Sequence, residues 1–214
     1  MLPMTGDLSV DAAVARLVEL AGSGARVIVG LVGEPGAGKS TVAAALVAGL
    51  ADRAITAALV PMDGFHLANA ELVRLGLRDR KGALETFDGA GYVALLRRLR
   101  EQSGETVYAP TYTRGLEESV AGAIPVGPEV AVVVTEGNYL LVDEGAWSSV
   151  RGLLDETWAV VTDQSVRRER LAARHVQFGK SPEAAAVWVD TVDEPNAVRI
   201  RATLKRADRT VVTG

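Results

Sequence analysis

The 214-residue chain contains no cysteine, which excludes a disulfide framework and any metal site built from thiolates. Long hydrophobic runs are missing too, since the longest uncharged apolar stretch, residues 42–51, is only about half a membrane span. Positive charge is scarce: 23 Lys and Arg against 27 Asp and Glu give a net charge of −4, which would repel nucleic acid and anionic membranes. Because no basic residue precedes Arg16, the N-terminus does not resemble a secretory signal. We expect a cytoplasmic protein without nucleic-acid or membrane partners.

Apolar residues make up 48% of the chain, enough for the core of one α/β domain of this length. Strand-like apolar runs occur at 26–32, 55–60, 130–135, 157–162 and 209–212, and helical patterns separate them. Such alternation is typical of a parallel sheet with crossover helices. Residues 7–22 have helical spacing, so we expect a helix to precede the first strand.

Residues 33–40 read Gly-Glu-Pro-Gly-Ala-Gly-Lys-Ser and match the phosphate-loop pattern G-x-x-x-x-G-K-[ST], directly after the first strand. The glycines allow a tight turn whose N–H groups converge on phosphate oxygens, and the next helix adds its positive N-terminal end. We predict that Lys39 bridges the β- and γ-phosphates of a nucleoside triphosphate and that Ser40 is a ligand of Mg²⁺. The predicted nucleotide-binding residues are Gly33, Pro35, Gly36, Ala37, Gly38, Lys39, Ser40 and Thr41.

An acidic residue follows each of the next two strands, Asp63 after the second and Glu136 after the third. The carboxyl ends of parallel strands meet at one edge of a sheet, so both carboxylates are expected to face the phosphate loop. Asp63 is the candidate base for the proton of an acceptor hydroxyl, with Gly64 letting the chain turn away behind it. Glu136 is the candidate to hold Mg²⁺, directly or through water. Both acids are candidates for metal and acceptor contact.

Residues 163–178 have a helical pattern in which Arg167, Arg170 and Arg174 recur at i, i+3 and i+7, on one face. Arginines so placed can neutralise a phosphate chain during phosphoryl transfer, and we take Arg170 and Arg174 as catalytic candidates. For any one of these arginines, a solvated basic face explains the pattern equally well.

Further motifs follow in a specific order. Residues 62–66 read Met-Asp-Gly-Phe-His, 108–112 read Tyr-Ala-Pro-Thr-Tyr and 135–137 read Thr-Glu-Gly, with other matches at 80–88 and 207–212. Together with the phosphate loop, they resemble the P-loop kinase family that contains uridine kinase, phosphoribulokinase and bacterial type I pantothenate kinase. The resemblance covers most of the chain.

The resemblance implies a P-loop NTPase three-layer sandwich, with a five-stranded parallel core flanked by helices, in a single domain over residues 1–214. It implies ATP and Mg²⁺ as cofactors, and transfer of the γ-phosphate to a hydroxyl of a small metabolite. An acceptor-binding insertion over 63–129 and a helical lid over 163–195 are implied as well. The implied acceptor contacts are Asp63, His66, Lys81, Tyr112 and Arg114.

Departures from the family pattern concern the acceptor. Where uridine kinases carry an aspartate for the ribose hydroxyls, this chain has Gly82, which argues against a ribonucleoside. Leu84 replaces a proline of the pantothenate kinases, and the chain is shorter than those enzymes. The acceptor therefore stays open among a sugar such as fructose, a nucleoside and a pantothenate-like alcohol. A monomer and a homodimer also both stay open.

Two other functions are weighed against this one. A nucleoside monophosphate kinase needs extra arginines for the acceptor phosphate, and Arg78, Arg80 and Arg114 are candidates for that role. A nucleotide-dependent switch or NTPase without a small-molecule acceptor is the second alternative. The chain lacks the Asn-Lys-x-Asp tetrapeptide by which such switches read guanine, which argues against a GTP-dependent switch.

Overall fold

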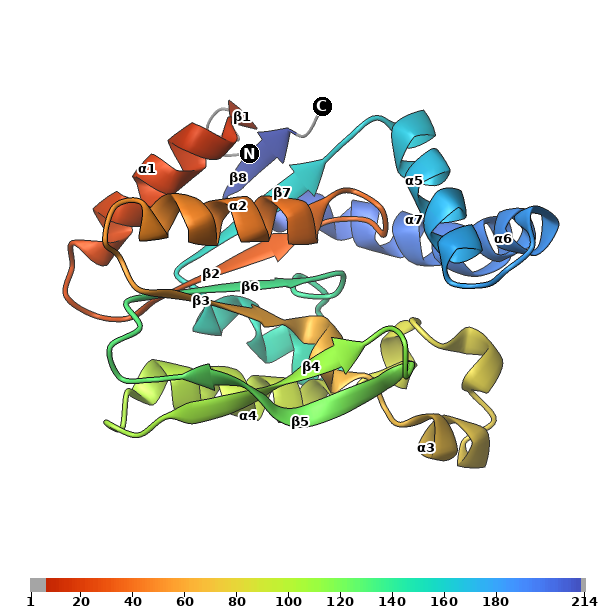
Figure 1. Ribbon diagram of the computed structural model, residues 1–214, viewed down its shortest axis with the longest axis horizontal. Coiled ribbons are helices and arrows are strands. Elements are labelled where there is room, and N and C mark those ends of the chain that lie inside the picture. Colours follow the sequence, from red (N-terminus) through yellow and green to blue (C-terminus); the bar gives the residue numbers. More distant parts are fainter. Residues whose placement is uncertain (1–6, 213–214) are drawn as a thin grey trace.

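The computed structural model describes residues 7–212 and shows a parallel sheet with helices on both faces (Figure 1). The strand order is β1-β8-β7-β2-β6-β3 and every adjacent pair is parallel. The predicted α/β sandwich is thus confirmed. The five expected strands are β2 (Val27–Val32), β3 (Ala57–Pro61), β6 (Val132–Gly137), β7 (Glu156–Val161) and β8 (Arg209–Val212).

A sixth strand, β1 (Asp7–Leu8), extends the five-stranded core beside β8 and corrects the expected helix over 7–22. The helix α1 (Val10–Ala21) begins later because the Ser9 side chain accepts a hydrogen bond from the Ala12 N–H and caps it. The residues before the cap are therefore extended, and they pair with the edge of β8.

The core lies on both sides of the sheet. All residues of β2 and β6 are buried, as in a sheet covered on both faces. One face packs against α1 and α2 (Lys39–Ala51), through side chains such as Leu17 and Leu46. The other face packs against α4 (Gly89–Glu101) and the segment 139–154, where Tyr92 and Trp147 are buried. No helix within residues 7–212 is long and apolar enough to span a membrane.

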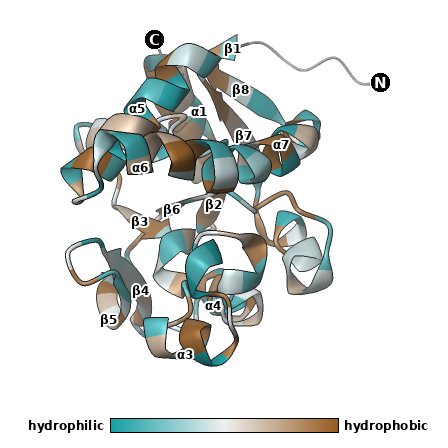
Figure 2. Cartoon of the chain, turned by 90° about the vertical axis from the view of Figure 1, so that its right-hand side faces the viewer, coloured by the Kyte–Doolittle hydropathy of each residue, from teal (hydrophilic) through white to brown (hydrophobic). Residues whose placement is uncertain are grey.

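We call the segment 63–129 the insertion. In the sequence it lies between β3 and β6. It contains α3 (Asn69–Arg74), α4 and an antiparallel hairpin of β4 (Val107–Thr113) and β5 (Glu118–Val126) that is separate from the main sheet. Figure 2 faces the edge where the parallel strands end, and there the hairpin and α3 lie below the sheet.

We call the segment 163–195 the lid. It lies above the same edge of the sheet (Figure 2). It contains α5 (Gln164–Gln177) and α6 (Pro182–Trp188), and a π-helical turn (Val189–Asp193) joins α6 to α7 (Glu194–Thr203). The Asp163 side chain accepts the Ser165 N–H and so fixes the start of α5. The insertion and the lid thus face each other across the carboxyl edge of the sheet.

Gly64 lies where the insertion leaves the sheet, and its role differs from the one expected. Its φ is outside the left-handed region, so no turn demands glycine there. Instead, a Cβ on Gly64 would lie 2.4 Å from the carbonyl oxygen of Pro110 in β4. Glycine is needed because the hairpin passes too close for a side chain.

We therefore expect Gly64→Ala to lower the free energy of unfolding by about 1–3 kcal/mol, because the backbone must shift to admit the methyl group. Urea unfolding measures this change. Gly152→Ala is the control, since a Cβ there meets nothing within 4 Å, and it should change stability by less than about 0.5 kcal/mol. Equal effects of the two substitutions would refute the steric explanation.

Candidate active site

The phosphate loop connects β2 to α2 at the carboxyl edge of the sheet. Gly36 and Gly38 have φ of 83° and 92°, a left-handed conformation that glycine adopts readily. Lys39 is buried, and its Nζ donates hydrogen bonds to the carbonyl oxygens of Gly33 (2.9 Å) and Glu34 (3.1 Å) and to Asn138 Oδ1 (2.7 Å). Burial lowers the pKa of Lys39, and the charges of Glu136 and Asp63 oppose that shift. The ammonium group therefore sits inside the loop, where phosphate oxygens are expected.

Ser40 and Glu136 meet directly. The Ser40 hydroxyl donates to Glu136 Oε1 at 2.8 Å, and only 6% of Glu136 is exposed. Burial raises the pKa of Glu136, and the charge of Asp63 raises it further, whereas Lys39 and the Ser40 hydrogen bond lower it. A hydroxyl and a carboxylate oxygen beside the phosphate loop form a donor set of the kind Mg²⁺ prefers.

Asp63 faces the same space from the end of β3. Its side chain is 32% exposed, and its Oδ2 lies 4.0 Å from Arg114 Nη2. Asp63 and Glu136 both line one cavity of about 770 Å³ together with the phosphate loop. The structure thus brings together the two acids that the strand-end argument placed at this edge.

The insertion forms one wall of this cavity. His66 stacks between Phe87 (ring centroids 4.0 Å apart) and Tyr112 (4.6 Å). Its Nδ1 lies 2.8 Å from the backbone oxygen of Asp63. A carbonyl can only accept, so Nδ1 carries the proton. Burial lowers the pKa of His66, which favours the neutral ring with Nε2 as an acceptor.

Other candidates line the same wall. Lys81 Nζ donates to Asn69 Oδ1 (2.7 Å) and to the Glu117 carbonyl oxygen, and it lies 5.1 Å from the centroid of the Tyr112 ring. The predicted acceptor residues that border the cavity are Asp63, His66, Lys81, Tyr112 and Arg114. Arg80 is not among the residues that border the cavity and instead forms an ion pair with Glu85 (2.5 Å), which argues against its contact with an acceptor phosphate.

The lid forms the opposite wall. Arg170 and Arg174 border the cavity, and burial together with the charge of Arg114 lowers the pKa of Arg174. Asp193, in the π-helical turn, accepts a hydrogen bond from His175 Nε2 (2.7 Å), and Lys180 Nζ lies 4.0 Å from the centroid of the Trp188 ring. The helical spacing that singled out the lid arginines did not predict these contacts.

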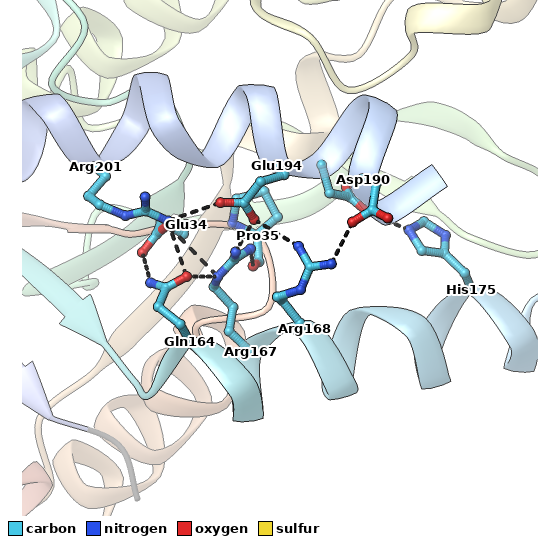
Figure 3. A network of polar contacts seen from close by, with 10 residues as sticks. Glu34, Pro35, Gln164, Arg167, Arg168, His175, Asp190, Glu194 and Arg201 are labelled. Carbon is cyan, nitrogen blue, oxygen red and sulfur yellow. Dashed lines mark hydrogen bonds and ion pairs between the residues drawn. The ribbon is translucent and has the colours of Figure 1, made fainter. Parts of the chain in front are cut away.

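Arg167 differs from Arg170 and Arg174, which corrects the expectation that all three face phosphates. Its side chain is only 1% exposed and points between α5 and α7 (Figure 3). It donates to the Pro35 carbonyl oxygen (3.3 Å), to Gln164 Oε1 (3.0 Å) and to Glu194. The reason is position: Arg167 is on the first turn of α5, which the phosphate loop covers, whereas Arg170 and Arg174 lie beyond it.

Arg167 belongs to a wider network around Glu34, which is 7% exposed. Glu34 accepts from Gln164 Nε2 (2.9 Å) and Arg201 Nη2 (2.5 Å) (Figure 3). Arg201 also lies 3.3 Å from Glu194 Oε1. We call Glu34, Gln164, Arg167, Glu194 and Arg201 the loop network. It ties the phosphate loop to α5 and α7, and sequence reasoning missed it because its members are up to 167 residues apart.

Comparisons with known proteins agree with this site. A model of the Phosphoribulokinase / Uridine kinase family matches residues 28–212. A proposed uridine kinase of Schizosaccharomyces pombe is 35% identical over 170 residues, which cover 77% of this chain and 72% of that protein. A pantothenate kinase of Leifsonia xyli is 31% identical over 208 residues, covering 84% of this chain and 63% of that protein.

A solved structure is similar over nearly its whole length. It is that of a kinase proposed to belong to a fructose transport system in Silicibacter, with a TM-score of 0.79 and 35% identity, covering 92% of this chain and 98% of that one. With the family match spanning both strand-end acids and the phosphate loop, the chain belongs to the phosphoribulokinase / uridine kinase family of P-loop kinases.

Proposed function

We propose that the chain transfers the γ-phosphate of ATP to a hydroxyl of a small metabolite, with Mg²⁺ bound. The observation that carries the proposal is the convergence of three groups on one cavity: the phosphate loop with Lys39, the hydrogen-bonded pair of Ser40 and Glu136, and Asp63. A switch or simple NTPase needs no wall for an acceptor, whereas here the insertion supplies one.

Each group has a role in that reaction. The phosphate loop and Lys39 hold the phosphate chain, and Ser40 and Glu136 would hold Mg²⁺, which when bound neutralises charge on the phosphate oxygens. Within residues 7–212, no three or more His, Cys, Asp or Glu side chains are grouped to hold a metal. Asp63 takes the proton of the acceptor hydroxyl, and Arg170 and Arg174 stabilise the negative charge of the transferring group.

The acceptor binds between the insertion and the lid in this proposal, against His66, Lys81, Tyr112 and Arg114. The names of the similar proteins mention uridine, pantothenate and a fructose transport system. A sugar such as fructose, a nucleoside and a pantothenate-like alcohol are accordingly the first acceptors to test.

ADP release tests the proposal when it is measured with ATP, Mg²⁺ and a panel of nucleosides, sugars, hydroxy acids and pantothenate-like alcohols. We expect at least one compound to raise ADP release well above the rate without acceptor. If the chain binds ATP but no compound on a broad panel stimulates it, the proposed kinase activity is wrong.

Glu136 offers a prediction in which activity falls without a loss of stability. We expect Glu136→Gln to lower turnover by about 10²-fold or more, because the neutral amide is a weaker magnesium ligand. The melting temperature should stay equal or rise by about 2–4 °C, since a buried charge is removed.

The pH dependence of stability should also differ between the two proteins. The raised pKa of Glu136 means that its contribution to stability is complete below the ordinary glutamate pKa of 4.5 and is lost as pH rises through the folded value. Thermal unfolding as a function of pH should show this loss in the wild type and not in Glu136→Gln. A variant much less stable than wild type at neutral pH would show that Glu136 is structural instead.

A further inference from the structure

The insertion side of the cavity carries two cations, Lys81 and Arg78, that form no ion pair within the described residues, although Glu117 borders the same cavity. Lys81 donates to neutral oxygens, those of the Asn69 amide and the Glu117 backbone. Arg78 also borders the cavity, and its side chain makes no hydrogen bond or ion pair within the described residues. Burial lowers the pKa of Lys81 and the charge of Arg78 lowers it further, whereas the charges of Glu117 and Glu118 oppose this shift. Two cations from one turn of the insertion therefore repel each other at the cavity wall.

The nearby acids are bound to other groups. The Glu117 carboxylate accepts the Tyr112 hydroxyl at 2.6 Å, and the Glu118 carboxylate accepts the Asn69 N–H at 3.1 and 3.2 Å. Arg80, between the two cations in sequence, is instead neutralised by Glu85. Arg78 and Lys81 thus differ from their neighbour in facing the cavity without a carboxylate partner.

The cations of the phosphate side are separate from this pair. Lys39 lies in the phosphate loop, and Arg170 and Arg174 come from the lid across the cavity. Lys39, Arg170 and Arg174 would therefore neutralise the charge of a triphosphate on the loop, without Lys81 and Arg78. Lys81 and Arg78 lie on the acceptor wall, beside the neutral ring of His66.

We propose that the acceptor carries an anionic group, a carboxylate or a phosphate, that Lys81 and Arg78 bind while Asp63 and His66 Nε2 accept hydrogen bonds from its hydroxyls. This inference rests on the proposed kinase function and narrows it to hydroxy acids and phosphorylated alcohols. Charge-assisted hydrogen bonds from both cations would compensate the repulsion between them. A neutral sugar or nucleoside would leave this pair without a partner.

Matched acceptors test the proposal: glycerol with glycerate, glucose with gluconate and glucose 6-phosphate, and uridine with uridine monophosphate. We expect kcat/KM for an anionic member to exceed that of its neutral partner by about 10- to 100-fold. The carboxylate and phosphate compounds show which anionic group is preferred. If neutral members react as well as anionic ones, this inference is overturned while the kinase function stands. If the chain binds ATP but turns over none of these compounds and none of the broader acceptor panel, both this inference and the kinase function are overturned.

Lys81→Gln tests the assigned residue. We expect KM for the anionic acceptor to rise by about 10- to 100-fold, with kcat within a few fold and ATP affinity unchanged. Lys81→Arg should restore part of the loss. Lys205→Gln, at an exposed lysine outside the cavity, is the control and should leave KM unchanged. An unchanged KM in Lys81→Gln, or a fall in kcat with unchanged melting temperature and KM, would contradict the assignment.

Discussion

Asp63→Asn is expected to lower the rate of phosphoryl transfer by about 10²–10⁴-fold while ATP binding is retained. The amide has the shape of the carboxylate but cannot take the proton of the acceptor hydroxyl. The fold should tolerate the change, because Asp63 is 32% exposed and its ion pair with Arg114 is 4.0 Å long. Steady-state ADP release gives the rate, and titration calorimetry gives the ATP affinity.

Asp79→Asn is the matched control, since Asp79 is exposed, lies in the same insertion and does not border the cavity. It should leave turnover within about twofold of wild type. Unchanged turnover in Asp63→Asn would refute the assignment of Asp63 as the base. A complete loss of ATP binding would show instead that its main role is in holding the nucleotide and metal.

Arg167→Met is expected to lower the free energy of unfolding by about 3 kcal/mol, because it removes a buried cation that contacts both the phosphate loop and α7. Glu34 would then keep Arg201, whose side chain is 43% exposed, and Glu194 would keep Arg201 and the surface residue Arg168. The expected loss of stability is at the low end of the range for a broken buried ion pair, because Arg201 still pairs with both carboxylates. Urea unfolding measures it.

Arg168→Met is the control on the adjacent residue. Arg168 is also 43% exposed and pairs with Asp190 (2.5 Å) and Glu194 (3.5 Å) at the surface, so its loss should cost less than about 1 kcal/mol. Similar losses in the two variants would contradict the structural role assigned to the loop network. ATP affinity should fall in Arg167→Met only, because Arg167 alone of the two contacts the loop backbone.

The parts of the site that could be predicted from sequence are those fixed by local pattern and sheet topology. The phosphate loop has its own spacing, and Asp63 and Glu136 follow from the rule that parallel strands end at one edge. No knowledge of side-chain packing was needed for either step. The parallel sheet followed from the alternation of strand and helix patterns in the same way.

The parts that could not be predicted depend on contacts between distant segments. Arg167, Arg170 and Arg174 share a helix face, yet only the packing of α5 on the phosphate loop separates the buried arginine from the two at the cavity. Likewise, Gly64 looked like a turn residue because the approach of Pro110 depends on how the hairpin folds back. Helical periodicity says which face a residue occupies, and not which partner covers it.

The most direct test of the central claim follows the γ-phosphate of ATP by phosphorus NMR, in the presence of Mg²⁺ and the acceptor panel. We predict a new phosphomonoester signal that grows as ATP is consumed. In Asp63→Asn this signal should be suppressed. Release of inorganic phosphate alone, at a rate independent of every acceptor, would contradict the account and show that the chain is an NTPase or a nucleotide-dependent switch.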